Sequence, residues 1–198
     1  MRKSNYSIGE TIYNIKCVIG TRLKYKGARL IRTPIAVRGK QYIDFGTGLT
    51  TGKNCQIEVN GDHEGKRLIF GKNVNIGHNV RIQCAEKILI GDNVLIGSRV
   101  TIIDNSHGSY SGNNQDSPEI APNERRLEIE PITIEANVWI GDGVIIQKGV
   151  NVGTGSIVSA NSVVTRDVLE NSIVGGIPAR TIKIYNPKTK EWVMYGKL

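Results

Sequence analysis

Few side chains in this 198-residue sequence could act as a base, a nucleophile or a metal ligand. The chain has three histidines and three cysteines, which are His63, His78, His107, Cys17, Cys55 and Cys84. The scattered cysteines form no CxxC pair and are expected to be buried, reduced thiols. No two histidines lie close together in the sequence, so a zinc site built from converging histidines is not expected. Histidine titrates near neutral pH, which makes general-base chemistry the use to consider for it.

His107 lies in a long polar segment without apolar periodicity, residues 104–131. An irregular segment of this length in a compact chain is usually functional or disordered. His78 lies at a corner of a regular repeat, and His63 lies in a shorter irregular stretch, residues 60–67; both are expected to be surface residues. His107 is therefore the candidate catalytic residue.

A six-residue repeat must build the elements that position His107. An aliphatic residue recurs at every sixth position late in the chain, at Ile134, Ile140, Ile146, Val152, Val158 and Val164. Interrupted copies precede it, at Phe45, Thr51, Ile57, Phe70, Ile76, Ile82, Ile90, Ile96 and Ile102, with a slip of two residues at 85–87. This period fits neither a helix nor a lone strand, and predicts short strands and corners that wind into a solenoid. Parallel crossovers are usually right-handed, so the period alone predicts a right-handed coil.

The N-terminal segment differs in charge from the rest of the chain. Residues 1–40 hold ten Lys or Arg and one Glu, a charge of +9, whereas the other 158 residues hold 16 basic and 17 acidic side chains, a charge of −1. Ser7 and Glu10 form a capping-box pattern, and apolar residues at helical spacing predict an amphipathic helix over 8–23 that packs on the body or on the next subunit. The basic segment could face anionic phospholipid, a lipid-diphosphate-linked substrate or solvent; no nucleic-acid-binding motif accompanies it, so no nucleic-acid partner is expected.

We expect one all-β domain with short flanking segments. Residues 1–36 form the basic segment, 37–176 the solenoid with residues 104–131 extruded from it, and 177–198 a C-terminal tail. The sequence has no run of 18 apolar residues and no secretory signal, so a cytoplasmic location, including the inner face of the membrane, is expected.

The hexads, the segment DNSHG (104–108) and the segment VGGIPAR (174–180) resemble those of the hexapeptide-repeat acyltransferases. Residues 137–168 are similar to the galactoside and maltose O-acetyltransferase branch. The chain as a whole, with its KIYNPKTKEW tail (183–192), resembles bacterial O-acetyltransferases of lipopolysaccharide O-antigen or capsule biosynthesis. The resemblance implies a left-handed parallel β-helix, which reverses the expected handedness. It also implies a homotrimer that uses acetyl-CoA and needs no metal.

The same resemblance implies roles for single residues. His107 would deprotonate the acceptor hydroxyl, which attacks the thioester of acetyl-CoA directly. Asp104 would either orient the imidazole or cap the turn, and Asn79 would contact the acceptor. Asn105 stands where related enzymes often have a second histidine, so no role is carried over to it.

Residues of the last coils would bind coenzyme A by the same carry-over. Trp139 would pack near the pantetheine arm, and Ser159 and Ala160 would offer their backbone N–H groups to its amides. Arg166 and Arg180 are the candidates for pairing with the 3′-phosphate, because a guanidinium group suits phosphate.

The leading hypothesis is an O-acetyltransferase that acts on a sugar of a surface polysaccharide or on its lipid-linked precursor. An N-acetyltransferase of an amino sugar or nucleotide sugar, and a non-catalytic β-helix scaffold, are the alternatives. A zinc-dependent lyase of the γ-carbonic anhydrase type lacks its close histidine pair here, and an ice-binding solenoid would need regular threonine ladders. The sequence leaves the acceptor sugar and its hydroxyl open.

Overall fold

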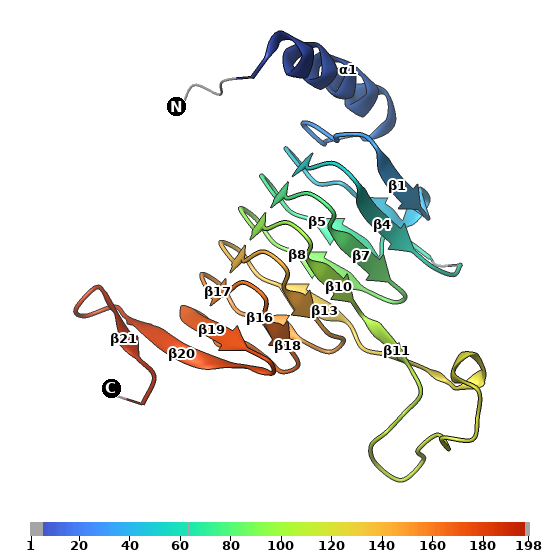
Figure 1. Ribbon diagram of the computed structural model, residues 1–198, viewed down its shortest axis with the longest axis vertical. Coiled ribbons are helices and arrows are strands. Elements are labelled where there is room, and N and C mark those ends of the chain that lie inside the picture. Colours follow the sequence, from blue (N-terminus) through green and yellow to red (C-terminus); the bar gives the residue numbers. More distant parts are fainter. Residues whose placement is uncertain (1–5, 63, 197–198) are drawn as a thin grey trace.

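The computed structural model describes residues 6–62 and 64–196, so His63 lies outside the described residues. Figure 1 shows a coil of short strands whose successive turns stack into three parallel sheets. The first sheet holds β3 (Thr50–Thr51), β6 (Asn75–Ile76), β9 (Leu95–Ile96), β14 (Trp139–Ile140), β17 (Ile157–Val158) and β19 (Ser172–Gly176). The second holds β1 (Ile35–Arg38), β4 (Cys55–Val59), β7 (Arg81–Cys84), β10 (Thr101–Ile103), β15 (Ile145–Ile146) and β18 (Val163–Val164). The third holds β2 (Ile43–Asp44), β5 (Leu68–Phe70), β8 (Ile88–Ile90), β13 (Ile132–Ile134) and β16 (Asn151–Val152).

The hexad aliphatics form the core, as the repeat predicts. Ile96, Ile140 and Val158 pair in register on successive turns, and all are at most 1% exposed. A second inward row lies two residues earlier in each hexad, and the six-residue pattern alone did not indicate it. This row includes Val138, Val144, Val150, Ser156 and Ser162. Stacking both rows excludes water from the axis of the coil, because each turn covers the apolar groups of the next.

Asparagines turn the corners of the coil. Asn73, Asn93 and Asn137 have φ between 57° and 59°, in the left-handed region that asparagine tolerates. Their side chains also stack, since Asn73 donates to Asn93 and Asn93 donates to Asn137, each at 3.3 Å. The corners are therefore stabilised both by the local conformational preference of asparagine and by a ladder of side-chain hydrogen bonds.

The helix α1 (Ile8–Lys24) lies across the N-terminal end of the coil. The predicted capping box is present, with Ser7 and Glu10 each bonded to the other's backbone N–H. The helix packs on the body through Tyr13, Cys17 and Thr21, and its isoleucines face away from the body. The helix therefore lies against the body, one of the two arrangements that the sequence leaves open, and a contact with the next subunit stays a prediction. No helix within the described ranges is long and apolar enough to cross a membrane.

Two antiparallel strands, β20 (Ala179–Asn186) and β21 (Glu191–Met194), extend the first sheet at the C-terminal end. Two short 3-10 turns, Lys40–Tyr42 and Pro122–Glu124, complete the secondary structure that the described residues show. The three cysteines are buried and free, as expected.

Candidate active site

His107 lies on a two-stranded ribbon that projects from the coil. Strand β11 (Asn105–His107) pairs antiparallel with β12 (Leu127–Ile129), and His107 lies opposite Leu127. The ribbon leaves the coil after β10 and returns before β13, and it projects to the lower right in Figure 1. The His107 side chain is exposed. The repeat thus stops where the chain builds a ribbon that presents the His107 side chain to solvent.

Asp104 fixes the base of this ribbon. Its side chain is 0% exposed, and its two oxygens accept hydrogen bonds from the backbone N–H groups of residues 85–87, at 2.7, 2.8 and 3.1 Å. The Asn105 amide donates a fourth bond at 3.1 Å. These bonds commit the carboxylate to the slip in the hexad pattern and support turn capping, one of its two expected roles; an orienting contact with the imidazole stays a prediction.

The buried thiol of Cys84 lies beside this carboxylate. Burial, and after it the negative charge of Asp104, together raise the pKa of Cys84 to about 12. The thiol therefore stays protonated at physiological pH and does not serve as a nucleophile.

The far part of the ribbon is braced by its own side chains. The Tyr110 hydroxyl donates to the backbone carbonyl of His107 at 2.6 Å, and Arg125 donates to the Tyr110 hydroxyl at 2.8 Å. Arg126 forms an ion pair with Asp116 at 3.6 Å, and Asp116 also accepts from the backbone N–H of Ser109 at 2.8 Å. The backbone that carries His107 is therefore held by a network, although the imidazole faces solvent.

Lys148 on the coil holds the returning strand. Its ammonium contacts Glu128 at 2.9 Å and also contacts Glu130. The hydrogen bond to Glu130 raises the pKa of Lys148, while a Ser109 hydroxyl and then Lys148 lower the pKa of Glu128. Sequence reasoning missed this clamp; its only signal was the pair of acids two residues apart, which a strand places on one face.

Trp139 lies on the outer face of the first sheet. It is 51% exposed and pairs in register with Leu95 on one side and Ile157 on the other. These three side chains make an exposed apolar strip that an extended apolar or amide-containing chain could follow.

Ser159 does not offer the backbone donor that the resemblance implied. Its N–H already donates to the Val174 carbonyl at 2.9 Å, inside the coil. Ala160 is exposed in the following turn, directly against Gly141. The expected donor role of Ser159 is therefore wrong, because its amide belongs to the sheet ladder; that of Ala160 stays a prediction.

Arg166 and Arg180 come together around one small cavity of about 120 Å³. The cavity is also lined by Asp167, Val174 and Ala179, and Arg180 donates to the Ala179 carbonyl at 2.8 Å. Both arginines are exposed. Arg166 follows β18 and Arg180 lies in β20, so strand β19 lies between them in the sequence. Two cations at one hollow are suited to an anionic group such as a phosphate.

Asn79 takes one of the left-handed corners, with φ of 56° and its N–H on the Lys53 carbonyl at 2.9 Å. The neighbouring His78 accepts from the Lys53 N–H at 3.0 Å through Nδ1. Both residues thus serve the corner, and an acceptor contact for Asn79 stays a prediction. Within residues 6–62 and 64–196, no three His, Cys, Asp or Glu side chains converge as a metal site requires.

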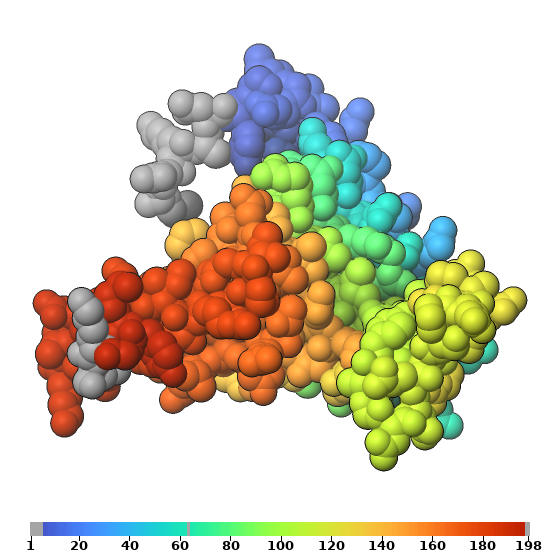
Figure 2. Space-filling view, turned by 60° about the horizontal axis from the view of Figure 1, so that its bottom comes forward, coloured from blue at the N-terminus to red at the C-terminus, as the bar shows by residue number. Residues whose placement is uncertain are grey.

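The ribbon and Trp139 lie on different sides of one chain, whereas Arg166 follows β18 at the same edge from which the ribbon leaves. The ribbon leaves the edge between the second and third sheets, which is opposite the first sheet with Trp139. Figure 2 shows the ribbon (yellow) and the C-terminal hairpin (red) projecting to opposite sides, as Figure 1 does. A single chain therefore does not bring His107 next to Trp139.

Comparison with known proteins gives matches along the coil. The model described as "Bacterial transferase hexapeptide (six repeats)" matches residues 131–166, and that of the "Hexapeptide repeat of succinyl-transferase" matches residues 87–108. The chain is 36% identical over 188 residues, 94% of either sequence, to an Escherichia coli protein with the provisional name lipopolysaccharide biosynthesis O-acetyl transferase WbbJ. It is 44% identical over 62 residues to the E. coli galactoside O-acetyltransferase, covering 31% of this chain and 30% of that protein.

Two solved structures share the fold. AntD, an N-acyltransferase from Bacillus cereus solved with a dTDP-linked amino sugar and coenzyme A, has a TM-score of 0.69 at 23% identity, over 93% of this chain and 92% of AntD. The hexapeptide-repeat acetyltransferase VCA0836 from Vibrio cholerae, solved with acetyl coenzyme A, has a TM-score of 0.51 at 28% identity, over 92% and 81% of the two chains.

Proposed function

Because the chain belongs to the hexapeptide-repeat acyltransferases, with their left-handed parallel β-helix, we propose that it transfers an acetyl group from acetyl-CoA to a hydroxyl of a surface-polysaccharide sugar or its precursor. The enzyme class and the acetyl-CoA donor follow from the family. The sugar hydroxyl and the histidine base are the proposal. The name of the E. coli relative, which matches over almost the whole chain, supports the choice of acceptor.

The exposed His107 on its braced ribbon is the observation that carries the proposal. A sugar hydroxyl is a poor nucleophile, and a neutral imidazole can remove its proton as the oxygen attacks the thioester carbon. The new C–O bond forms, the C–S bond breaks, and the proton held by His107 passes to the departing CoA sulfur. The negatively charged oxygen that develops on the carbonyl would be stabilised by a backbone N–H in the cleft.

The donor would lie along the first sheet of a neighbouring subunit. Trp139 and its neighbours Leu95 and Ile157 provide apolar surface for the pantetheine arm, and the Arg166–Arg180 cavity provides cations for the 3′-phosphate. His107 is on the opposite edge of its own chain, so the complete site requires the ribbon of one subunit and the first sheet of another. A homotrimer with three such sites satisfies this requirement.

The test is CoA release with acetyl-CoA and a panel of lipid-linked glycans, free sugars and amino sugars. We expect turnover with a hydroxyl acceptor, and a kcat for His107→Ala about 10²- to 10⁴-fold lower, the usual contribution of a general base. His78→Asn is the matched control, because the asparagine oxygen can replace Nδ1 as the acceptor at its corner. Unchanged turnover in His107→Ala would disprove the base assignment, and transfer only to amines would replace the O-acetyl proposal with N-acetylation.

A second experiment compares acetyl-CoA with acetyl-dephospho-CoA, which lacks the 3′-phosphate, as the donor. Arg166→Ala with Arg180→Ala should raise KM for acetyl-CoA by at least about tenfold, since charged hydrogen bonds are lost. The same double variant should have little effect on KM for acetyl-dephospho-CoA. An equal effect on both donors would remove the phosphate-binding role.

A further inference from the structure

The helix α1 presents its most hydrophobic side to solvent. Five large aliphatic residues along one face are between 50% and 82% exposed; they are Ile8, Ile12, Ile15, Ile19 and Leu23, called here the isoleucine stripe. Their spacing of three or four residues places them on one side of the helix, opposite Tyr13, Cys17 and Thr21. The body of the protein thus binds the smaller and more polar side of the helix.

The contacts that fix this orientation are specific. The Thr21 hydroxyl accepts from the Ile31 N–H at 2.8 Å and donates to the Cys17 carbonyl at 2.6 Å. The Tyr13 hydroxyl donates to the Thr33 carbonyl. Because buried polar groups need these partners, rolling the helix to bury the isoleucine stripe would leave them unsatisfied. The exposure of the stripe is therefore built into the packing of the helix.

Basic side chains surround the isoleucine stripe. At 100° per residue, Lys16 and Arg22 lie on its two flanks, whereas Lys24 lies in the last turn on the side that faces the body. Arg29 and Arg32 line the hollow of about 620 Å³ beside Ile15 and Ile19. An apolar face bordered by Lys and Arg is typical of a helix that lies in the interface of an anionic membrane.

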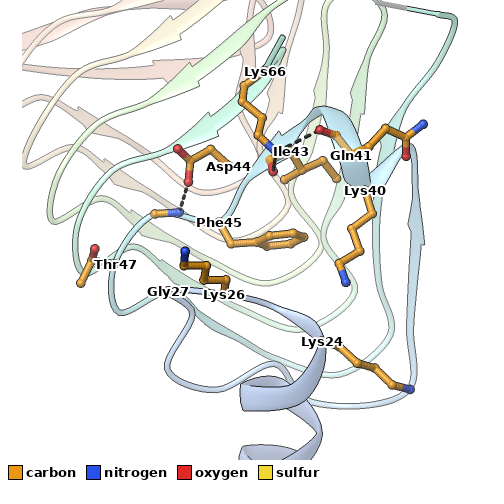
Figure 3. A pocket seen from close by; sticks show the side chains of 11 residues that line it. Lys24, Lys26, Gly27, Lys40, Gln41, Ile43, Asp44, Phe45, Thr47 and Lys66 are labelled. Atoms are coloured by element: carbon orange, nitrogen blue, oxygen red, sulfur yellow. Dashed lines mark hydrogen bonds between the residues drawn. The ribbon is translucent and has the colours of Figure 1, made fainter.

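A lysine-lined cavity adjoins the C-terminal end of α1. Its volume is about 820 Å³, and its cations are Lys24, Lys26, Lys40 and Lys66. Figure 3 shows these side chains around a hollow between the end of α1 and the first turn of the coil. Lys66 is held by the carbonyls of Gln41 and Ile43, at 2.9 and 3.0 Å.

The charge of this cavity is positive despite one acid in its lining. Lys40 lies over the ring of Tyr25, 5.2 Å from its centroid, which orients its ammonium without neutralising it. Asp44 accepts from the Gly46 N–H at 2.9 Å, and it is the single carboxylate against four ammonium groups. The cavity therefore favours phosphate-bearing groups.

We propose that the isoleucine stripe and the lysine-lined cavity together bind the surface of an anionic phospholipid membrane. The stripe enters the headgroup–acyl boundary, and the cavity takes lipid phosphates. A contact between two copies of this same surface is disfavoured, because residues 1–40 carry a charge of +9 and two such segments would repel. This binding is independent of the acetyl transfer proposed above.

The position of α1 suits this role. In Figure 1, α1 lies at one end of the coil and the ribbon with His107 projects near the other end. Figure 2 shows the same separation from a second direction. A membrane bound at α1 would therefore leave the ribbon uncovered.

Co-sedimentation with vesicles tests the proposal. The full chain should bind vesicles that contain phosphatidylglycerol, and bind vesicles of phosphatidylcholine alone much more weakly. Lys26→Gln with Lys40→Gln should weaken this binding about 30-fold, from roughly 1 kcal/mol per basic residue near an anionic surface. Ile15→Gln with Ile19→Gln should weaken it at least about tenfold, because less apolar area enters the interface.

Matched controls lie at the other end of the molecule. Lys183→Gln with Lys188→Gln removes two lysines from the C-terminal hairpin, and Leu169→Gln changes an exposed aliphatic of the last coil; vesicle binding should stay at the wild-type level in both. Circular dichroism and turnover with a water-soluble acceptor show that each variant is folded. Equal binding to neutral vesicles would overturn the proposal. Unchanged binding in both the lysine double variant and the isoleucine double variant would overturn it as well. So would a stripe variant that loses only its oligomeric state, or tight binding of free pyrophosphate without any vesicle binding.

Discussion

Asp104 is a buried carboxylate that provides hydrogen-bond acceptors for backbone N–H groups at an irregular point of the coil. The hexads slip by two residues at 85–87, and the slip leaves three backbone N–H groups without a partner on the next turn. The carboxylate of Asp104 accepts from all three, and from Asn105. A buried carboxylate is tolerated because several N–H donors stabilise its charge. The same residue directly precedes β11, so the slip and the ribbon with His107 are joined at one side chain.

We expect Asp104→Asn to lower the free energy of unfolding by about 2–4 kcal/mol, because one accepting oxygen becomes an NH₂ group that faces N–H donors. Urea titration measures the change. Asp142→Asn is the matched control, since the Asp142 carboxylate is about half exposed and accepts a single amide bond, from Ser98 at 2.8 Å; its cost should be below about 1 kcal/mol. Equal losses in the two variants would contradict the anchoring role.

The ribbon is an element whose order depends on contacts at both of its ends. Its base is fixed by Asp104, its outer turn by Tyr110 and Arg125, and its return by the Lys148 clamp. An antiparallel pair this short is marginal alone, so these contacts keep the His107 backbone in place. The clamp also makes the order of the ribbon depend on pH. The pKa of Glu128 is lowered in the folded protein, so its contribution is present above the ordinary glutamate pKa and is lost as pH falls through the lowered value. The pKa of Lys148 is raised, so its contribution is lost only as pH rises above its ordinary range.

Lys148→Met should speed hydrogen exchange of the β11 and β12 amides relative to wild type at neutral pH, because both acids lose their cation. The ratio of variant to wild-type rates should approach one in acid, where Glu128 becomes protonated in both proteins. Lys72→Met, which removes a lysine from a coil corner, is the control and should leave the ribbon amides unchanged. A ratio that stays constant over this pH range would exclude the clamp as the cause.

The coil is elongated, and the basic helix, the ribbon and the proposed donor residues lie at different places on it. The N-terminal end carries the basic helix, one edge carries the ribbon with His107, and the first sheet carries Trp139 of the proposed donor site. Because the ribbon and Trp139 lie on opposite sides of one chain, the proposed site combines parts of two chains. Under this proposal, oligomerisation is a requirement for activity and not only a source of stability.

Subunit mixing tests this requirement. His107→Ala and the double variant Arg166→Ala with Arg180→Ala should each have low activity alone at subsaturating acetyl-CoA. Unfolding and refolding them together in equal amounts should restore about a quarter of wild-type activity, because a quarter of the sites then combine two unaltered halves. Mixing the separate single variants Arg166→Ala and Arg180→Ala is the control, and it should restore less, since both alter the same half. No recovery in the first mixture would show that one chain supplies the whole site.

The features that the sequence alone determined are local. The six-residue spacing from Ile134 to Val164 predicts the coil because each residue repeats the same backbone path, and Ser7 with Glu10 predicts the start of the helix because a capping box needs only four residues. The position of His107 in a break of the repeat was visible for the same reason.

Only the tertiary structure decided how distant segments meet. The partners of Asp104 lie about twenty residues earlier, on the preceding turn of the coil, and the ladder bond that occupies the Ser159 N–H comes from the following turn. The isoleucine stripe predicted the helix, but not which side packs on the body, because the hydrogen bonds of Thr21 and Tyr13 are made to residues 31–33, which the helix meets only in the folded chain. Periodicity reports the conformation of a segment, whereas the partners of a polar group depend on which turns the coil stacks together.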